Sequence, residues 1–457
     1  MGLSNVLAKY IESTTYEEIP SHVIEFTKLC ILDWLGSAVA GHGKQPIQII
    51  HELIEDLGSK PQSTLVTGGK SSVTHAALVN GAASHIVELD DIHKSSIIHA
   101  ATVVIPAAIA VAEWKRKSGK DLITAVVVGY EVCYRIGEAV SPSHYYYWHN
   151  TATCGTFGAA AAVSKLLNLN EEQIVSALGS AGTQAAGLWE FIEDTAMTKQ
   201  LHPGKAAMNG VISALLAEKG FTAAKQILEG KRGFFNAMSE NYDAHKITTN
   251  LGEVHKIIEN SIKVHASCRH THSTMDLAIE LSRENALTVD DVEKIKVGTY
   301  QVALNITDNP HPTTVYASKF SLQFCTALAF VKGHGGLFDF NEETLHDPVI
   351  RALMDKVTVE VEESIHNAYP TEWGSIVQIR LKDGRVIEKQ TNYPKGDLEN
   401  PVSKEEMVAK FEELASELPN ETVKTYTDRV LRLEELPSVH TLLVLEETME
   451  AGYETIN

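Results

Sequence analysis

Small residues recur at helical spacing through about the first 240 residues, and this pattern constrains the fold more than any other feature. Apolar side chains follow one another at intervals of three and four residues, with runs of alanine and glycine among them. The clearest run is GTFGAAAAV at residues 155–163. It is too short to span a bilayer and is followed by Lys165, so close packing of helices is the ordinary explanation. The first half of the chain is therefore predicted to be a helical bundle.

Strand patterns begin after about residue 260. They cover residues 292–300, 356–361 and 375–390. The last of these contains Asp383-Gly384, a pair typical of tight hairpin turns, and is expected to form two strands. Ser403 and Glu406 then have the spacing of a capping box, which marks a return to helix. The sequence predicts a mainly α protein with a smaller α+β domain, and C-terminal helices that can rejoin the first part.

The balance of charge limits the partners of the chain. Its 457 residues include 39 lysines and arginines against 59 aspartates and glutamates, a formal net charge of −20. An acidic surface repels nucleic acid and anionic membranes, so neither is an expected partner. An anionic substrate would need a local cationic pocket, which makes clustered Lys, Arg and His residues the ones to locate.

Cysteine usage and the N-terminal sequence indicate a cytoplasmic protein. The five cysteines are odd in number, far apart and without a C-x-x-C pair, so neither a disulfide framework nor a cysteine zinc site is expected. The N-terminus lacks the basic and apolar segments of a secretion signal. The longest apolar run, residues 100–112, is too short to cross a bilayer and contains Pro106. We expect no membrane-spanning segment.

The first candidate for chemistry is an acidic segment rich in histidine. Glu88, Asp90 and Asp91 are followed by His93 and His99 within twelve residues. Carboxylates and imidazoles shift one another's pKa values, which is how proteins obtain acids and bases near neutral pH. A solvated connection between two helices is the alternative interpretation.

Two further segments carry cationic groups just ahead of expected helices. His149 precedes the small-residue helix, where unpaired N–H groups and the helix dipole favour anions. Lys199, His202 and Lys205 repeat the arrangement, with Pro203 expected in the first turn of the next helix. Each segment is a candidate anion site, and a simple helix entry is the alternative.

A fourth group lies near the expected change of domain, at residues 263–272. His265, His270 and His272 would project to one face if this segment were a strand, where they could ligate a metal. The metal interpretation is weak because no H-E-x-x-H motif accompanies them. Arg269 favours an anion-binding segment, since a guanidinium binds a carboxylate through two hydrogen bonds.

Five ordered segments resemble the MmgE/PrpD family, which includes 2-methylcitrate dehydratase, cis-aconitate decarboxylase and iminodisuccinate epimerase. In chain order they are ALVNGAASHIVELDDIH with HAATVVIPAA, HNTATCGTFGAAAAVSKLL, TKQLHPGKAAMNG, KVHASCRHTHSTMDLA and SKFSLQF. The resemblance implies a large all-helical domain of residues 1–262 and 400–457 and a smaller α+β lid domain of residues 263–399. It also implies a homodimer whose active site lies between the domains and uses neither a metal nor an organic cofactor.

The resemblance also implies which residues form the site. His99, His149 and Lys199 match positions of the family's active site, Asp91 matches an aspartate of its acidic loop, and His272 matches its lid-side histidine. We expect Asp91, His99, His149 and Lys199 to be catalytic, with Asp91 orienting a histidine. Contacts to the substrate are expected from Glu88, His202, Arg269, His270, His272 and Phe324.

Two positions depart from the family's pattern. Where the decarboxylase and dehydratase resemble D-x-[DN]-D-T, this chain begins its loop with Glu88 and ends it with Ile92, so one carboxylate is longer and a hydroxyl is absent. Phe324 stands where the decarboxylase has a tyrosine. A lost hydroxyl removes a hydrogen-bond partner that a polar substrate needs, so either change would alter substrate choice.

The leading hypothesis from the resemblance is a lyase of the cis-aconitate decarboxylase type, acting on a small di- or tricarboxylate and giving itaconate and carbon dioxide. Lys199, Arg269 and His202 would hold carboxylates, while His99 and His149 would supply a proton to the developing carbanion. Dehydration of 2-methylcitrate and epimerisation of iminodisuccinate need the same acid and base, so residue types do not separate the three. A metal-dependent hydrolase and a non-catalytic helical interaction protein are the alternatives from other classes.

Overall fold

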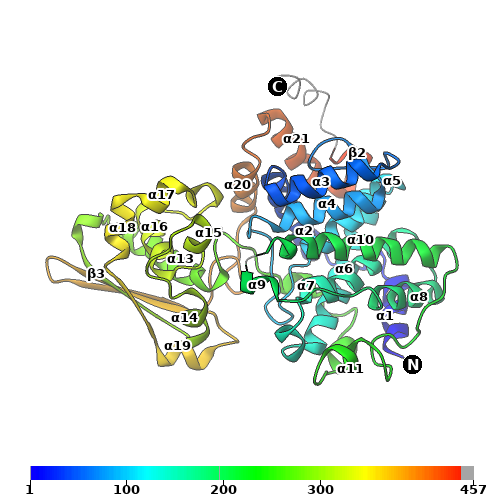
Figure 1. Ribbon diagram of the computed structural model, residues 1–457, viewed down its shortest axis with the longest axis horizontal. Helices are drawn as coiled ribbons and strands as arrows, with labels where there is room; N and C mark the ends of the chain where they lie inside the picture. The colour runs from blue at the N-terminus through cyan, green and yellow to red at the C-terminus, as the bar shows by residue number, and fades with distance from the viewer. Residues whose placement is uncertain (1, 195, 444–457) are drawn as a thin grey trace. The chain divides into compact units, whose positions relative to one another are not determined.

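The computed structural model describes residues 2–194 and 196–443, which group into two compact units. The first unit lies within Met1–Ser261 and Ser403–Asn457, and the second is Ile262–Val402. The first is built of helices, and the second combines helices with a four-stranded sheet (Figure 1). The expected fold class, mainly α with a smaller α+β part, is confirmed.

The first unit is a bundle in which α4, α5, α7 and α10 pack against one another (Figure 1). Its helices are α1 (Leu3–Ser13), α2 (Ser21–Gly41), α3 (Gln45–Leu57), α4 (Val73–His85), α5 (Ala101–Trp114), α6 (Gly119–Val140), α7 (Asn150–Leu166), α8 (Glu171–Gly182), α9 (Phe191–Asp194), α10 (Thr198–Glu218), α11 (Phe234–Met238), α12 (His245–Thr248), α20 (Lys404–Leu414) and α21 (Asn420–Leu431). A short antiparallel pair, β1 (Ser63–Thr64) and β2 (Lys70–Ser71), precedes α4.

Small residues let these helices approach closely. All residues of α7 from Asn150 to Ser164 are buried, which confirms that the alanine-rich run is a core helix. At the crossing of α4 and α10, a Cβ added to Gly204 would lie 2.2 Å from the carbonyl oxygen of Leu78. A Cβ added to Gly81 would lie 2.9 Å from the Cα of Gly204. Glycine on both helices is therefore what allows this contact.

The first residues of helices α7 and α10 determine where the candidate cationic groups lie. His149 is the N-cap residue of α7, as expected. The other expectation was wrong, because α10 begins at Thr198 and Pro203 lies inside the helix. Lys199 and His202 are therefore helical residues of the first turns and do not belong to a preceding loop. Pro203 only removes the N–H that would bond the Lys199 carbonyl, a cost that a helix bears most easily near its start.

The second unit contains a sheet with strand order β4-β3-β5-β6. The strands are β3 (Val292–Thr299), β4 (Val357–Val361), β5 (Ser375–Leu381) and β6 (Val386–Thr391). β3 pairs with β4 in parallel and with β5 antiparallel, and β5 and β6 form the expected hairpin, with Gly384 at φ +90° in its turn. The helices are α13 (His272–Glu284), α14 (Gln301–Thr307), α15 (Val315–Ser318), α16 (Leu322–Lys332), α17 (Glu342–His346), α18 (Pro348–Met354) and α19 (Glu363–Ala368).

One face of this sheet is covered by helix. Alternate residues of β5, namely Ser375, Val377, Ile379 and Leu381, are buried. Helix α13 packs against β5 and β6, and α16 contacts β4. This packing explains the period-two pattern of the sequence, since a strand with one covered face alternates apolar and polar residues.

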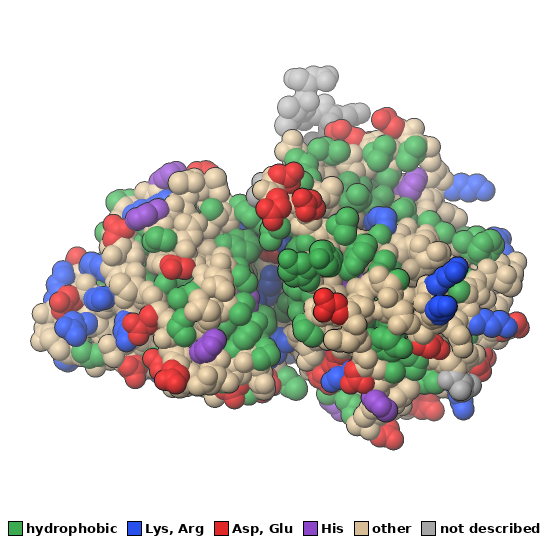
Figure 2. Space-filling view, turned by 60° about the horizontal axis from the view of Figure 1, so that its bottom comes forward, with side chains coloured by type: hydrophobic (Ala, Val, Ile, Leu, Met, Phe, Trp, Pro, Cys, Tyr) green, Lys and Arg blue, Asp and Glu red, His purple; other side chains and the backbone are tan. Residues whose placement is uncertain are grey.

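The surface is mixed in charge. On the face drawn in Figure 2, basic side chains are scattered among acidic ones and form no broad basic patch. Within residues 2–194 and 196–443, no helix combines the length and apolar character that crossing a bilayer requires.

Candidate active site

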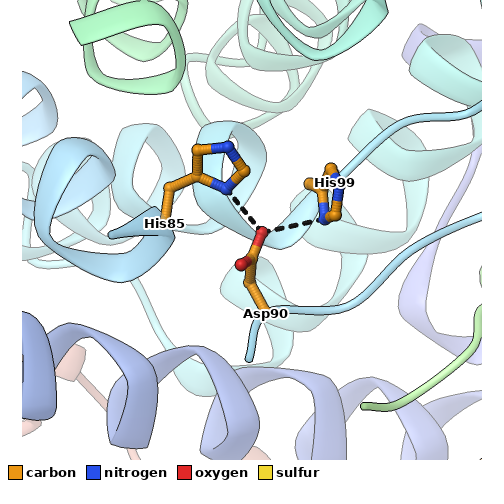
Figure 3. A group of neighbouring side chains, drawn as sticks. All are labelled: His85, Asp90 and His99. Carbon is orange, nitrogen blue, oxygen red and sulfur yellow. Dashed lines mark hydrogen bonds and ion pairs between the residues drawn. The ribbon is translucent and has the colours of Figure 1, made fainter. Parts of the chain in front are cut away.

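Three side chains of the first unit meet at one carboxylate oxygen. His85, the last residue of α4, and His99, just before α5, both point at Asp90 in the loop between them (Figure 3). Nδ1 of His85 is 2.7 Å from Asp90 Oδ2, and Nδ1 of His99 is 2.9 Å from the same oxygen. The side chains of His85 and Asp90 are fully buried, whereas 14% of the His99 side chain is exposed. Of the three, His99 is the one that a substrate can reach from this unit's surface.

The distances between the ring nitrogens and the carboxylate oxygen in the trio of His85, Asp90 and His99 are those of hydrogen bonds. Its three ligand atoms lie within 4.8 Å of one another, which is near enough for a shared ion. However, ligand atoms around a tetrahedral zinc are about 3.3 Å apart, given bonds of about 2.0–2.1 Å. The 2.7 and 2.9 Å separations are shorter than that, so they suit protons between the rings and the carboxylate.

A second cluster with metal-like composition already contains a cation. His93 lies 3.2 Å from Glu259 and 3.9 Å from Glu138. The ammonium group of Lys256 is 3.0 Å from a carboxylate oxygen of each of these glutamates. Lys256 supplies the positive charge that the two carboxylates need, so this cluster has the composition of a partly buried ion-pair network. His93, which stood out in the sequence, belongs to it.

A pair of histidines extends the site toward α10. Nδ1 of His149 is 3.1 Å from Nδ1 of His202. One nitrogen must donate and the other accept, so the uncharged pair carries one proton between these two atoms. The ring of Trp189 packs against His149 with centroids 4.8 Å apart, and the ring of His85 is 5.8 Å from His149. The trio and this pair therefore form one continuous group of imidazoles.

Burial determines the charge of these groups. It lowers the pKa of His85 despite Asp90 nearby, and it lowers the pKa of His149 well below its usual range, with His85 and His202 adding to the effect. Burial also lowers the pKa of His202 to about 4. Burial alone would raise the pKa of Asp90, but the charges and hydrogen bonds of His85 and His99 outweigh it and hold that pKa well below its usual range. At neutral pH the site holds an ionised Asp90 beside the uncharged rings of His85, His149 and His202.

Lys199 is the cationic residue of the site, and its ammonium group is paired with a carboxylate. Its ammonium group contacts the carboxylate of Glu88, and only 15% and 11% of the two side chains are exposed. Glu88 has φ +61°, a left-handed conformation that residues other than glycine adopt infrequently. Lys199 also lies close enough to lower the pKa values of His85, His149 and His202. The sequence candidates Glu88 and Lys199 are thus together at the edge of the imidazole group.

Asp91 is placed differently from its neighbour. Its carboxylate accepts hydrogen bonds from Tyr130 at 2.8 Å, from Asn260 at 2.6 Å and from the backbone N–H of Ala101 at 3.1 Å. Its backbone carbonyl, 2.6 Å from Nδ1, is the part that meets His99. The carboxylate that orients histidines is that of Asp90, one residue before the position to which the sequence assigned this role. A catalytic part for Asp91 stays a prediction.

In the second unit, Arg269 is committed to internal contacts. It lies 2.5 Å from Asp397 Oδ1 through one terminal nitrogen. The other donates to Nδ1 of His272 at 2.8 Å and to the carbonyl of Lys395 at 3.1 Å. Only 3% of the arginine side chain is exposed. A clamp on a substrate carboxylate would require this pair to open, and it stays a prediction.

The segment around residue 270 is helical and does not form the strand considered for a metal site. Residues Arg269–Thr271 form a 3-10 turn and His272 begins α13, so alternate residues do not share a face. Nε2 of His265 is 2.9 Å from Asp276, whereas His270 stacks on Trp373 with centroids 4.6 Å apart. The three histidines therefore have separate partners.

Two further candidates of this unit, His272 and Phe324, are fully buried, and a third, His270, is partly buried. Burial lowers the pKa of His270 to about 4, and its Nδ1 is 2.6 Å from the hydroxyl of Tyr300. His272 is fully buried, and its Nε2 faces the carbonyl of Ser267 at 3.3 Å. Phe324 on α16 is also fully buried and packs near Phe340. Substrate contact by any of them stays a prediction.

Sequence reasoning missed His85 and its neighbour Trp189, and it gave Asp90 no role of its own. His85 was not singled out although it lies five residues before Asp90, and Asp90 itself was seen only as part of the acidic loop. Trp189 carried no signal at all. A histidine ending a helix immediately before an acidic loop is the one clue that could have pointed to His85, because a short loop folds back on the helix that precedes it.

Comparison with known proteins covers nearly the whole chain. Residues 5–246 match the model of the MmgE/PrpD N-terminal domain, and residues 265–433 match that of the C-terminal domain. A cis-aconitate decarboxylase of Aspergillus terreus is 29% identical, over 97% of this chain and 96% of the relative. The human cis-aconitate decarboxylase is 27% identical, over 97% and 94%. A mitochondrial 2-methylcitrate dehydratase of Yarrowia lipolytica is 25% identical, over 85% and 79%.

Proposed function

Because the chain belongs to the MmgE/PrpD family, we propose that it is a lyase that converts cis-aconitate to itaconate and carbon dioxide. The observation that carries the proposal is the match to proteins named cis-aconitate decarboxylase over 97% of this chain. We extend the proposal to the way the enzyme works: in the cytoplasm, as a homodimer, without a metal or an organic cofactor.

The charges around the imidazole group support an anionic substrate. A chain with a formal net charge of −20 repels a tricarboxylate unless cations are gathered locally. Lys199 stands beside His149 and His202, where a substrate carboxylate could replace Glu88 as its partner. His99, the partly exposed ring of the trio, is the proposed proton donor.

The reaction needs one proton for each turnover. The bond between carbon and one carboxylate breaks, and carbon dioxide leaves. The freed electron pair forms the new double bond, while the carbon at the far end of the old double bond takes up a proton. We propose that this proton comes from His99 or His149 and that Lys199 stabilises negative charge on a remaining carboxylate. Aspartate 90, ionised and buried, would make His99 a better proton carrier.

Dehydration is the second candidate reaction. The relative named 2-methylcitrate dehydratase shares 25% identity over 85% of this chain. The missing hydroxyls at Ile92 and Phe324 favour a substrate that differs from that of the decarboxylases. In a dehydration the same imidazoles would remove a proton and protonate the leaving hydroxyl. Epimerisation of an iminodicarboxylate would use them to remove and return a proton at one carbon.

Proton NMR of product mixtures tests the proposal. The purified protein is treated with a chelator and incubated in deuterated buffer with cis-aconitate, 2-methylcitrate or iminodisuccinate in separate tubes. We expect vinylic itaconate signals in the first tube. Methylaconitate signals in the second would establish the dehydratase instead, and deuterium exchange without conversion in the third would indicate an epimerase. Activity that vanishes with the chelator and returns with a metal would contradict the cofactor-free proposal.

A matched pair of variants shows whether turnover belongs to this site. His149→Ala should abolish turnover, since it removes the ring that links His85 to His202. The control is His144→Ala, five residues earlier, which removes another buried ring whose partners are Met238 and Thr153. We expect the control to lower the thermal midpoint but to keep turnover. Equal activity in both variants would place the chemistry elsewhere.

A further inference from the structure

The hydrogen bonds of the trio determine which nitrogen of His99 is available for chemistry. Nδ1 of His99 faces Asp90 Oδ2 at 2.9 Å and the carbonyl oxygen of Asp91 at 2.6 Å. A carbonyl oxygen and an ionised carboxylate oxygen only accept hydrogen bonds. Nδ1 must therefore carry a proton, and Nε2 of His99 is the nitrogen that gains or loses one.

His85 has the same arrangement but no exposed side. Its Nδ1 faces the same oxygen, Asp90 Oδ2, at 2.7 Å, so this nitrogen also carries a proton. Its Nε2 is buried and has no hydrogen-bond partner among the described residues, and the same holds for Oδ1 of Asp90. The one charge of Asp90 thus faces two protonated Nδ1 atoms through a single oxygen.

We propose that Asp90 is the positioning residue of this site, which fixes Nε2 as the working nitrogen of His99 and divides one counter-charge between His99 and His85. The inference deepens the proposed function, on which it rests for the part that His99 plays with substrate. Asp90 and His85 are fully buried, so they act through His99 and need not touch the substrate.

Sharing of the Asp90 charge between two imidazoles predicts the direction in which the proton affinity of His99 changes. An opposite charge within about 4–6 Å favours the charged form of an imidazole, so Asp90 raises the proton affinity of His99. The hydrogen bond from His85 takes part of that charge and lowers the effect. The other titratable groups around the rings are His149 at the start of α7, Lys199 and His202 on α10, and Glu88 and Asp91 of the loop. None of them changes in the variants below.

Three variants separate this role from simple support of the fold. Asp90→Asn removes the charge 2.9 Å from Nδ1 of His99, so the pKa of His99 should fall relative to wild type. His85→Phe removes the competing donor and should raise that pKa. His85→Asn is the matched control, because its amide N–H can replace the Nδ1 donor, and it should leave the pKa near the wild-type value. Loss of structural support alone would move no pKa in these opposite directions.

The measurement is a pH titration of the protein labelled with nitrogen-15 in its histidines, without substrate. We expect the His99 ring to carry its proton on Nδ1 when uncharged. In turnover, Asp90→Asn should lower kcat by about 10²–10⁴-fold with a much smaller change in KM. The pH at which kcat is half-maximal should shift in the same direction as the titration.

Two results would overturn the inference. One is an uncharged His99 with its proton on Nε2 in the wild-type protein, a result that stands even if a variant fails to fold. The other is an unchanged or parallel shift in the Asp90 and His85 variants. Because the titration needs no substrate, a protein that behaves as expected here but converts no carboxylate would contradict the proposed function alone.

Discussion

Lys199 and Glu88 form an ion pair that is nearly enclosed. Removing one of the two charges therefore leaves the other largely buried without that counter-charge. In Lys199→Met the largely buried Glu88 carboxylate loses this ammonium group, and its pKa should rise relative to wild type because burial disfavours the charged form. A folded carboxyl with a raised pKa binds protons that the unfolded chain releases. We therefore expect the variant to lose stability relative to wild type as the pH rises from about 4 to 8, measured by urea unfolding.

The control for this prediction is the double variant Glu88→Gln with Lys199→Met. It carries no unpaired charge, so its stability should follow wild type across the pH range. Its turnover should stay as low as that of Lys199→Met, because the cation is still missing. Recovery of turnover in the double variant would mean that Lys199 serves only to neutralise Glu88.

Asp91 gives a pH dependence of the same sign in the native protein. Burial, aided by the charge of Asp90, raises its pKa to about 7 against the opposing hydrogen bonds of Tyr130 and Asn260. Its contribution is fully present below about pH 4 and is lost as the pH rises toward 7, a change on the order of 4 kcal/mol. Asp91→Asn should remove this change. In urea unfolding between pH 4 and 8, the free energy of wild type should fall relative to that of the variant as the pH rises, and parallel curves would refute the assignment.

At the level of elements, the crossing of α4 and α10 holds the two ends of the site together. Helix α4 ends in His85, and α10 begins with Lys199 and His202 in its first turns. Gly204→Ala would place a Cβ 2.2 Å from the Leu78 carbonyl oxygen, so the helices must separate. We expect a loss of about 1–3 kcal/mol or more in the free energy of unfolding. Turnover should fall as well, because Lys199 and His202 move away from Glu88 and His149.

Gly43→Ala is the matched control, since a Cβ added at Gly43 would meet nothing within 4 Å. Its free energy of unfolding and its turnover should stay close to wild type. If Gly204→Ala behaved like Gly43→Ala, the backbone contact would not position the site.

Elements with a strong periodic pattern could be predicted from the sequence, and those set by tertiary contacts could not. The strands β3 to β6 and the start of α7 were predicted because alternation, an Asp-Gly turn and an alanine-rich run are local signals. The start of α10 was misplaced because Pro203 is normally a first-turn residue, yet the helix begins at Thr198.

At the scale of the whole molecule, buried uncharged histidines should make the protein sensitive to acid. Burial lowers the pKa values of His144, His202 and His270 to about 4. Each binds its proton near pH 6.5 in the unfolded chain, so its contribution is present above about 6.5 and is lost as the pH falls toward 4. Over this range the three outweigh the opposite trend of Asp91, and stability should fall with acid.

The measurement is the slope of unfolding free energy against pH between 4 and 6.5. Each such histidine contributes up to about 1.4 kcal/mol per pH unit. His144→Gln, outside the site, should lower the slope by up to that amount. An unchanged slope would mean that His144 is protonated in the folded protein.

The assembly of the site is the part that a single sequence leaves open. Glu88, His99, His149, Lys199 and His202 were chosen from the sequence, but their segments are separated by up to about a hundred residues. Which carboxylate faces a histidine ring depends on the backbone path of a short loop. A shift of that path by one residue would place Asp91 where Asp90 lies. That is why the loop could be recognised from the sequence, whereas the facing of the rings by the carboxylate of Asp90 and by only the backbone carbonyl of Asp91 could not.

The burial of α7 also affects how fast its backbone amides exchange hydrogen with solvent. Amides of a helix that is buried on every side exchange with solvent only when large parts of a protein open, whereas those near exposed ends exchange through local fluctuations. His149 caps α7, and its own N–H bonds to the carbonyl of Gly187 at 2.9 Å, so it is attached to backbone that should exchange slowly. Lys199, in the first turn of α10, is attached to backbone that can fray. The imidazole would thus act as a fixed reference point, and the ammonium group as the part that adapts to each substrate molecule.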